Sequence, residues 1–329
     1  MRLRVLECPR CGAPLPKRAA LVKVVCEYCR SEVVLDRYVV KASEYHGALV
    51  DYLSVDDARK FEVGGVSYRL RGQLAVGHSS DVWLAERATR LSERVVIKML
   101  RAAEDRALLQ HEQNIVRDLE RSTERGCDYF ATLLPQRVAF GQGSRKGDAP
   151  TLSAVFREPI GFAHTLLDVQ QAFPSGCDPR HLVWIWRRIL ELLSWVHRSG
   201  KVHAAVLPAH VLLNARDHAA RLVGWACAAP AGASLSMAAA TDLDVYPELE
   251  LAGAPLSPRT DLAMTARGLL KIFGQRVDTA PAHFPPSLAA LLEREASGAG
   301  EIDAWRLSEQ VSAVARESFG PPKFVALNL

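Results

Sequence analysis

The feature that most constrains the fold is a change of hydrophobic period along the chain, from short β-branched runs to long amphipathic segments. Residues 68–75, 80–87, 94–100 and 152–157 fit strands, whereas 180–198, 260–273 and 305–315 fit helices. In the first helix Leu182, Ile185 and Ile189 share one broad apolar face. Strands followed by helices predict an α+β domain with a small sheet lobe and a helical lobe. Residues 141–150 and 228–240, rich in Gly, Ala and Pro, are expected to be loops.

Composition and charge exclude several classes of protein. Hydrophobic residues make up 49% and charged residues 24%, which is ordinary for a globular chain. The net charge is only +4, with 41 basic residues set against 37 acidic ones, so the charge of the chain is too weak to imply nucleic-acid binding. The start carries no apolar region of a secretory signal, and no run of apolar residues is long enough to cross a membrane. We therefore expect a cytoplasmic protein with no membrane partner, and the Ala- and Arg-rich composition suggests a bacterial source.

Two CxxC pairs near the N-terminus predict a metal site. Cys8 and Cys11 form the first pair, Cys26 and Cys29 the second, with fourteen residues between the pairs. Four thiolates satisfy the tetrahedral preference of Zn²⁺ and leave no open position for a catalytic water. Gly12 follows the first pair, where a knuckle needs a residue that tolerates positive φ. The segment resembles a zinc ribbon with a structural Zn²⁺.

These patterns divide the chain into three parts: a zinc ribbon over residues 1–36, a linker with a short helix over 37–66, and the α+β domain over 67–320. The ribbon is expected to dock a protein partner or to hold the N-terminus in place. Basic residues around the four cysteines leave nucleic-acid binding through the ribbon open as an alternative.

The strand-rich part carries groups suited to binding phosphates. Gly77 lies in the turn after residue 76, and Lys98 ends the apolar strand that follows. Glycine lets backbone approach a phosphate closely, and a lysine near it can neutralise the charge. The next helix carries Glu112 and Glu120.

The strongest pattern comes after the long helix, in the stretch from Gly200 to Leu213. His203, Pro208 and the apolar residues 211–213 resemble the catalytic loop of protein kinases, and Gly77, Lys98 and Glu112 lie in the order that this family requires. The resemblance covers about 250 residues and implies a two-lobed kinase-like fold. It also implies an ion pair between Lys98 and a glutamate of the following helix, Glu112 first and Glu120 second. ATP binding is left open, through Lys98 and the segment near 156–159.

The same resemblance exposes three departures. Ala205 replaces the catalytic aspartate, His210 replaces the metal-binding asparagine, and Gly224 replaces the metal-binding aspartate of the DFG motif, where Trp225 takes the place of phenylalanine. Since Mg²⁺ needs hard oxygen ligands, Mg²⁺ binding is not expected at these positions. Asp217, Asp242 and Asp244 lie in loops that could supply carboxylates from elsewhere.

Residues that maintain the kinase fold remain. Tyr246-Pro247-Glu248 resembles the end of the activation segment, and Asp261 matches the buried aspartate that begins the central helix of the large lobe. Arg306 stands where kinases carry an arginine that pairs with the glutamate, so we expect a buried Glu248–Arg306 ion pair.

The residues that maintain the kinase fold are present, but the catalytic and metal-binding residues are replaced. This combination predicts a pseudokinase, an inactive regulatory or scaffolding protein that binds other proteins. Two alternatives stay open. The first is an atypical serine/threonine kinase, or other ATP-binding phosphotransferase, with relocated carboxylates. The second is a nucleic-acid binder that acts through the zinc ribbon.

Overall fold

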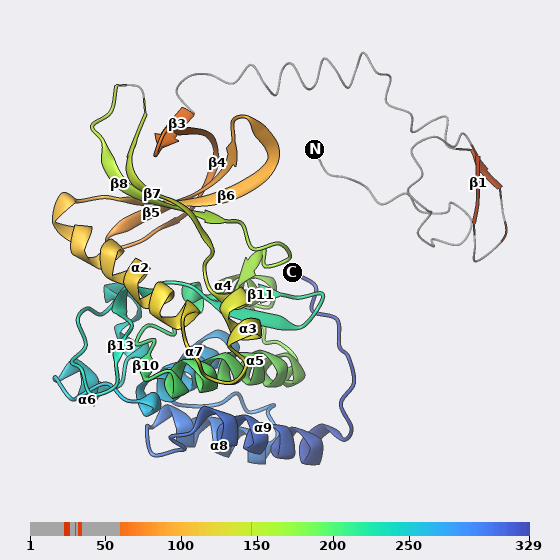
Figure 1. Ribbon diagram of the computed structural model, residues 1–329. Helices are drawn as coiled ribbons and strands as arrows, with labels where there is room; N and C mark the ends of the chain where they lie inside the picture. Colours follow the sequence, from red (N-terminus) through yellow and green to blue (C-terminus); the bar gives the residue numbers. More distant parts are fainter. Residues whose placement is uncertain (1–22, 27–29, 31, 35–59, 146) are drawn as a thin grey trace. The chain divides into compact units, whose positions relative to one another are not determined.

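The computed structural model describes residues 23–26, 30, 32–34, 60–145 and 147–329 (Figure 1). The chain divides into two compact units, residues 1–57 and 58–329. In the first unit, strands β1 (Lys23–Val25) and β2 (Glu32–Val34) form an antiparallel hairpin. The predicted helix near residues 45–53 and three of the four zinc-site cysteines lie outside the described residues.

The small lobe of the second unit is a closed barrel of six antiparallel strands in the order β3-β4-β5-β6-β8-β7. The barrel interior is filled by apolar side chains such as Val63, Val95, Ile97 and Val155, all fully buried. Its strands are β3 (Lys60–Val63), β4 (Val66–Val76), β5 (Ser80–Arg87), β6 (Arg90–Leu100), β7 (Arg137–Ser144) and β8 (Thr151–Arg157). The four strands predicted from the sequence are β4, β5, β6 and β8.

Strand β3 closes the barrel, because it pairs with β4 on one side and with β7 on the other. It lies within the stretch 37–66 that the sequence predicts as linker, and residues 141–144, expected to be loop, belong to β7. The reason is a contact between the two strands. The ring of Phe61 lies against Gly143 so closely that a Cβ there would be 2.4 Å from Cζ. The glycine that suggested a loop instead makes room for a core aromatic.

Helix α2 (Arg106–Glu120) follows β6 and buries the face that carries Leu109, Ile115, Val116 and Leu119. Short helical turns flank it, namely η3 (Ala103–Asp105), α3 (Cys127–Phe130) and η4 (Ala131–Leu133). This segment is the connection between β6 and β7, and it extends from the barrel toward the large lobe (Figure 1).

The large lobe is helical and is built around α5 (Pro179–Arg198), where Leu182, Ile185, Trp186 and Leu193 are buried. The other helices are α4 (Leu166–Ala172), α6 (Glu248–Leu251), α7 (Pro258–Gly274), α8 (Pro286–Ala296) and α9 (Ala304–Phe319), with 3₁₀ turns η5 (Pro208–His210), η6 (Trp225–Cys227) and η7 (Ala240–Val245). Short strands complete it, namely β9 (His164–Thr165), β10 (Lys201–Val202), β11 (Val211–Asn214), β12 (Ala219–Leu222) and β13 (Ala229–Pro230). The helices predicted over 180–198, 260–273 and 305–315 are α5, α7 and α9.

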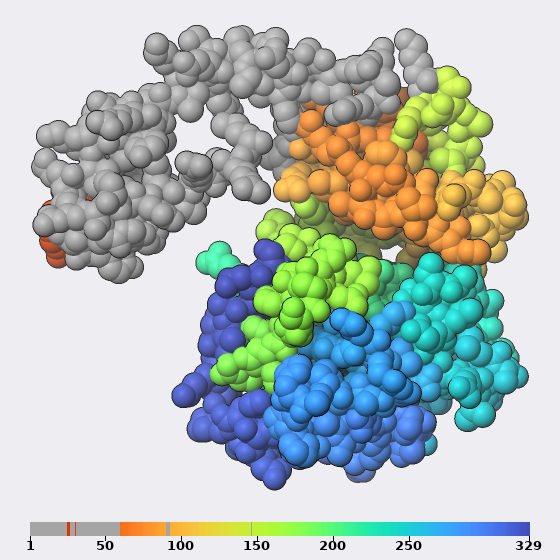
Figure 2. Space-filling model, turned by 180° about the vertical axis from the view of Figure 1, so that it is seen from behind, coloured from red at the N-terminus to blue at the C-terminus, as the bar shows by residue number. Residues whose placement is uncertain are grey.

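Local signals explain where the two central helices begin. The Asp178 carboxylate accepts a hydrogen bond from the Arg180 amide at 2.9 Å, and Pro179 takes the first position of α5. Ser257 and Thr260 form a capping box before α7, again with proline at its first position. Helices α5 and α7 pack against each other, and Figure 2 shows the small lobe stacked on the large one. Among the described residues no helix is long and apolar enough to span a bilayer.

Candidate functional site

Lys98 on β6 and Glu112 on α2 form the ion pair predicted from the sequence. Lys98 Nζ lies 2.6 Å from Glu112 Oε2, and the glutamate side chain is almost completely buried. Its other oxygen, Oε1, accepts a hydrogen bond from the backbone N–H of Trp225 at 3.1 Å. Glu120, the second candidate, is exposed. Glu112 therefore joins the barrel, α2 and the large lobe at one carboxylate.

Gly77 lies in the tight turn between β4 and β5. Its amide donates to the carbonyl of Ser80 at 2.8 Å, and a Cβ at Gly77 would lie 2.9 Å from the same carbonyl oxygen. The turn therefore requires glycine for its own geometry. That requirement is independent of any phosphate, so a role for Gly77 in nucleotide binding stays a prediction.

The loop that carries His203 is held by Asp261, the first acidic residue of α7. This aspartate is fully buried, as predicted, and it accepts hydrogen bonds from the amides of His203 and Ala204, each at 2.8 Å. His197 Nε2 lies 2.9 Å from the same carboxylate. Ala204 has a φ of +56°, an unfavourable conformation for a residue with a Cβ, and the bond from its amide to Asp261 stabilises that conformation.

Ala205, at the position of the catalytic base, is in an apolar environment. It is 1% exposed and packs with Val202, Ala204, Cys227 and Leu256. An ionised carboxylate here would lie among methyl groups and a thiol, which is unfavourable without a partner. The backbone carbonyl of Ala205 is used, because it accepts a hydrogen bond from His210 Nδ1 at 2.8 Å.

His210 and Gly224, at the two metal-ligand positions, lie against each other. A Cβ at Gly224 would lie 2.6 Å from Cε1 of His210 and 2.7 Å from each ring nitrogen. The imidazole thus fills the space in which a side chain at position 224 would begin. Burial lowers the pKa of His210, so at neutral pH the ring is mainly uncharged. Neither position offers the oxygen ligands that Mg²⁺ requires.

Trp225 and His203 pack against each other next to His210 and Gly224. Both side chains are fully buried, and their ring centroids are 4.4 Å apart at an interplanar angle of 65°. Burial lowers the pKa of His203 to about 4, which keeps it neutral. His203 Nδ1 accepts a hydrogen bond from the amide of Ala205 at 3.3 Å, so this histidine supports the loop.

The aspartates considered as relocated metal ligands have other partners. Asp217 accepts a hydrogen bond from the side chain of Asn214 at 2.9 Å. Asp242 and Asp244 both bind Lys271 of α7, at 3.2 and 2.8 Å. Over residues 60–145 and 147–329, no three His, Cys, Asp or Glu side chains come together as a metal site.

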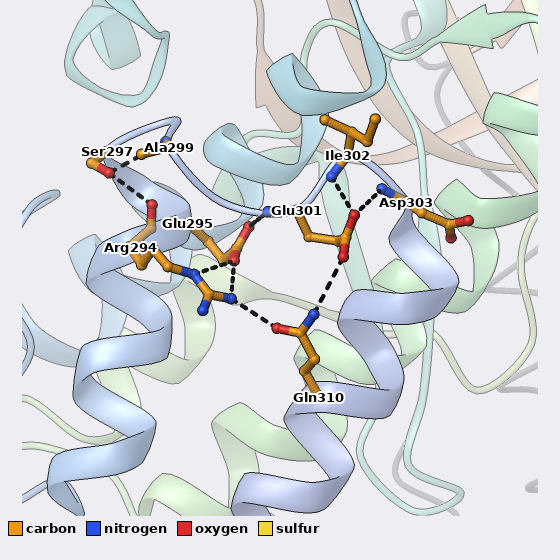
Figure 3. A network of polar contacts seen from close by, with 8 residues as sticks. All are labelled: Arg294, Glu295, Ser297, Ala299, Glu301, Ile302, Asp303 and Gln310. Atoms are coloured by element: carbon orange, nitrogen blue, oxygen red, sulfur yellow. Dashed lines mark hydrogen bonds and ion pairs between the residues drawn. The ribbon is translucent and has the colours of Figure 1, made fainter.

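The predicted ion pair between Glu248 and Arg306 is wrong. Both residues are exposed, and the two do not bond to each other. The buried carboxylate of this region is instead Glu295 on α8, which pairs with Arg294 at 2.8 Å and accepts from the amide of Glu301 at 3.0 Å (Figure 3). The segment near Tyr246 is held by Arg267 of α7, whose guanidinium donates to the carbonyls of Tyr246 and Ala296 at 2.8 Å each. The sequence suggested an ion pair at a place where the chain uses backbone carbonyls.

Of the predicted zinc ligands, Cys26 alone lies within the described residues. It follows β1 and is fully buried. The carbonyl of Cys26 accepts a hydrogen bond from the amide of Arg30 at 2.9 Å, and Arg30 has a φ of +59°. Cys8, Cys11 and Cys29 lie outside the described residues.

Contacts between α2, its following segment and the large lobe were not predicted from the sequence. His111 Nε2 lies 2.7 Å from the carbonyl of Ala228, and the ring of Phe130 stacks on Trp195 of α5 at 5.8 Å. Arg221 of β12 donates to the carbonyls of Leu133 and Leu134 at 3.0 and 2.6 Å. These partners are about 65 to 120 residues apart in sequence, and no local pattern indicates such pairs.

Comparison of the sequence with protein-family models and with curated proteins gives no match. Solved structures do resemble the chain. The kinase domain of BubR1 aligns with a TM-score of 0.58 at 13% identity, over 84% of this chain and 91% of that one. The chain has a protein-kinase-like fold. Vaccinia related kinase 3 aligns with the same TM-score and identity, over 83% of this chain and 95% of its own. In this kinase-like fold, the β-rich lobe precedes the helical lobe, and Lys98, Glu112, Ala205, His210 and Gly224 meet where the two lobes join.

Proposed function

We propose that this protein is a pseudokinase, a kinase-like scaffold that binds protein partners and does not transfer phosphate. The observation that carries the proposal is the contact between His210 and Gly224. The imidazole of His210 occupies the space in which a side chain at Gly224 would begin, and neither side chain provides an oxygen ligand. Phosphoryl transfer in kinases depends mainly on positioning and on charge neutralisation by the metal, so loss of the metal site removes the largest catalytic contribution.

The apolar surroundings of Ala205 support the same conclusion. A general base at this position is typically worth about 10²–10⁴-fold in rate. Here the site has adapted to alanine, because Val202, Cys227 and Leu256 pack around it. Reversing the substitution would bury an unpaired charge, so the loss of the base is accommodated by the surrounding core.

The contacts between the lobes support a scaffolding role. Glu112 bonds to the amide of Trp225, His111 contacts the carbonyl of Ala228, and Arg221 holds the segment after α3. We infer that these contacts limit opening between the lobes, which suits a binding platform.

Nucleotide binding without Mg²⁺ remains part of the proposal through Lys98. Lys98 keeps the ion pair with Glu112 that positions such a lysine in kinases, but Gly77 is the sole glycine at the tip of the β4–β5 turn and makes a weak cradle for phosphates. We therefore expect weak binding of ATP, independent of divalent cations.

For the N-terminal unit we propose a structural Zn²⁺ held by Cys8, Cys11, Cys26 and Cys29. The turn from Cys26 to Arg30 supports it, because Arg30 adopts the positive φ expected after the second thiolate of a knuckle. A zinc-to-protein ratio of one in the purified chain, lost in Cys26→Ser, would support the site. A ratio of zero in protein prepared with zinc would contradict it. Retention on DNA or RNA at physiological salt, lost together with the zinc, would favour the nucleic-acid alternative.

The pseudokinase proposal is tested by transfer of labelled phosphate from ATP, with Mg²⁺ or Mn²⁺, to the protein itself and to a generic substrate. The wild-type chain should show no more labelling than Lys98→Met, in which the predicted phosphate-binding lysine is absent. Complex formation with a protein partner should be the same with and without Mg-ATP. Labelling of the wild-type chain that disappears in Lys98→Met would overturn the proposal in favour of the atypical kinase.

A further inference from the structure

The chain continues beyond α9 as an extended segment, residues 321–329, here called the C-terminal strap. It contains no helix or strand and runs back along the large lobe toward β11 (Figure 1). Side chains hold it in place. Leu327 is 5% exposed and belongs to the main core of the lobe, and Leu329 packs against the same core. An extended segment held by a few apolar side chains can open locally at a small fraction of the global unfolding free energy.

Phe324 attaches the strap to the lobe through a stack of three aromatic rings. Its ring lies 4.2 Å from that of His218, at an interplanar angle of 18°. On its other face His218 lies 4.4 Å from Trp184 of α5, at 3°. The imidazole is thus sandwiched between one ring of the lobe and one ring of the strap, although Phe324 itself remains 67% exposed.

His218 is fixed in this position by its backbone. It lies in the turn between β11 and β12 with a φ of +49°, and its carbonyl accepts a hydrogen bond from Arg188 Nε at 3.0 Å. Its Nε2 is buried and has no hydrogen-bond partner within the part of the chain that the structure describes. A proton added to this nitrogen would therefore have no acceptor while the strap is closed, and water could reach it if the strap opened.

The charged groups around His218 also disfavour a second positive charge. From α5, Arg188 contacts its backbone and His181 lies with its ring centroid 6.4 Å away. The strap itself contributes Lys323, next to Phe324. The neighbouring carboxylate, Asp217, is bonded to the side chain of Asn214. Burial lowers the pKa of His218, the backbone of Val325 opposes this shift as a hydrogen-bond acceptor, and Arg188 adds to it.

We propose that the C-terminal strap is a releasable latch over Trp184, and that protonation of His218 opens it. When the strap leaves, the faces of Trp184 and His218 and the site of Leu327 on the large lobe become accessible. The strap is then an internal ligand of this surface, and a partner segment of similar chemistry, an aromatic residue followed by leucines, would compete with it at low pH.

The pH at which the strap opens follows from the difference between the pKa values of His218 in the open and closed states. In the open state His218 has an ordinary pKa near 6.5, and in the closed state its pKa is lower. The closed state is therefore fully favoured above pH about 6.5. As the pH falls from there toward the lowered value, the opening equilibrium constant rises by up to about tenfold per pH unit.

The first measurement is the pKa of His218 in the full chain, followed by NMR of the imidazole and assigned with His218→Gln. The wild-type value should lie below 6.5, and Phe324→Ala should move it toward 6.5 because one of the two rings that bury the imidazole is gone. Identical values in the two proteins would overturn the proposal. A wild-type value above 6.5 would do the same, because two aromatic faces would then be stabilising the imidazolium.

The second measurement is opening itself, read as tryptic cleavage after Lys323, which is exposed and lies within the strap. Cleavage rates are divided by those of a free peptide with the strap sequence, to remove the pH dependence of the protease. The normalised rate should rise as the pH falls below 6.5 in the wild type and in His181→Gln, and should stay level in His218→Gln. A level wild-type rate, or a pH dependence that follows His181 instead, would contradict the role of His218. An unchanged main thermal transition shows that each variant is folded.

Discussion

Gly224 should not tolerate a side chain for two reasons, its positive φ and its contact with the ring of His210. Gly232 shares only the first reason, so a comparison of the two glycines separates them. Gly224 has a φ of +79° and contacts the ring of His210, whereas Gly232 has a φ of +91° and nothing within 4 Å of its Cβ position. Gly232→Ala should lower the free energy of unfolding by about 1–2 kcal/mol, the cost of alanine at positive φ. Gly224→Ala should cost about 1–3 kcal/mol more, because the methyl group meets the imidazole.

Chemical denaturation of both variants measures this difference, and His210→Ala supplies the control. In that background the extra cost of Gly224→Ala should disappear, since the ring that it meets is gone. Equal costs at 224 and 232 in the wild-type background would mean that the imidazole does not occupy the metal-ligand space.

His203 makes stability depend on pH. Burial lowers its pKa to about 4, against about 6.5 in an unfolded chain, so the neutral ring is favoured in the folded state. Its stabilising contribution is complete above pH 6.5 and is lost as the pH falls toward 4, by about 3 kcal/mol in all. Comparing the free energy of unfolding of the wild type and His203→Leu over this range isolates the effect from that of the carboxylates. Parallel curves for the two proteins would show that His203 does not titrate in this way.

At the scale of elements, closure of the small-lobe barrel depends on the fit of Phe61 against Gly143. A methyl group at Gly143 would overlap the ring, whereas Gly141 on the same strand has nothing within 4 Å of its Cβ position. Gly143→Ala should therefore destabilise the protein by about 1–3 kcal/mol more than Gly141→Ala, as overpacking generally does. Thermal unfolding of the pair measures it. Equal melting temperatures would mean that β3 does not seat Phe61 against β7.

This contact also shows how far sequence reasoning could go. Strands β4, β5, β6 and β8 carry β-branched runs, and the long helices carry apolar faces, so local pattern identified them. Strand β3 is four residues long, and β7 contains glycines at positions 141 and 143, so a local pattern reads both as connections. Their pairing joins residues about 80 apart in sequence, and it is decided by the fit of one ring.

In the candidate site, too, some contacts could be predicted from the sequence and others could not. Lys98 and Glu112 could be paired because the resemblance to kinases implies an ion pair between the strand lysine and a glutamate of the following helix. Asp261 was predictable from its place in the kinase pattern. The local sequence could not show that Glu248 and Arg306 do not pair. In this part of the structure Arg267 donates to the carbonyl of Tyr246, and Glu295 accepts from the amide of Glu301. The contact between His210 and Gly224 required three-dimensional positions.

At the scale of the whole molecule, contacts between protein groups join the two lobes. Glu112 links β6, α2 and the backbone of Trp225, and Arg221 links β12 to the segment that leads into β7. Ligands stabilise a protein only in proportion to their binding, so the effect of ATP on unfolding reports directly on the site.

The central claim is that the imidazole of His210 fills the space at position 224, so that the two metal-ligand positions offer no side-chain ligand for Mg²⁺. The most direct test is the melting temperature of the full chain with saturating ATP, measured in EDTA and again with excess Mg²⁺, each against the matching ATP-free sample. We predict that the ATP-induced shift is the same in the two conditions. A larger shift with Mg²⁺, lost when Asp217, Asp242 or Asp244 is replaced by asparagine, would contradict the claim, because it would mean that carboxylates from another loop hold the metal.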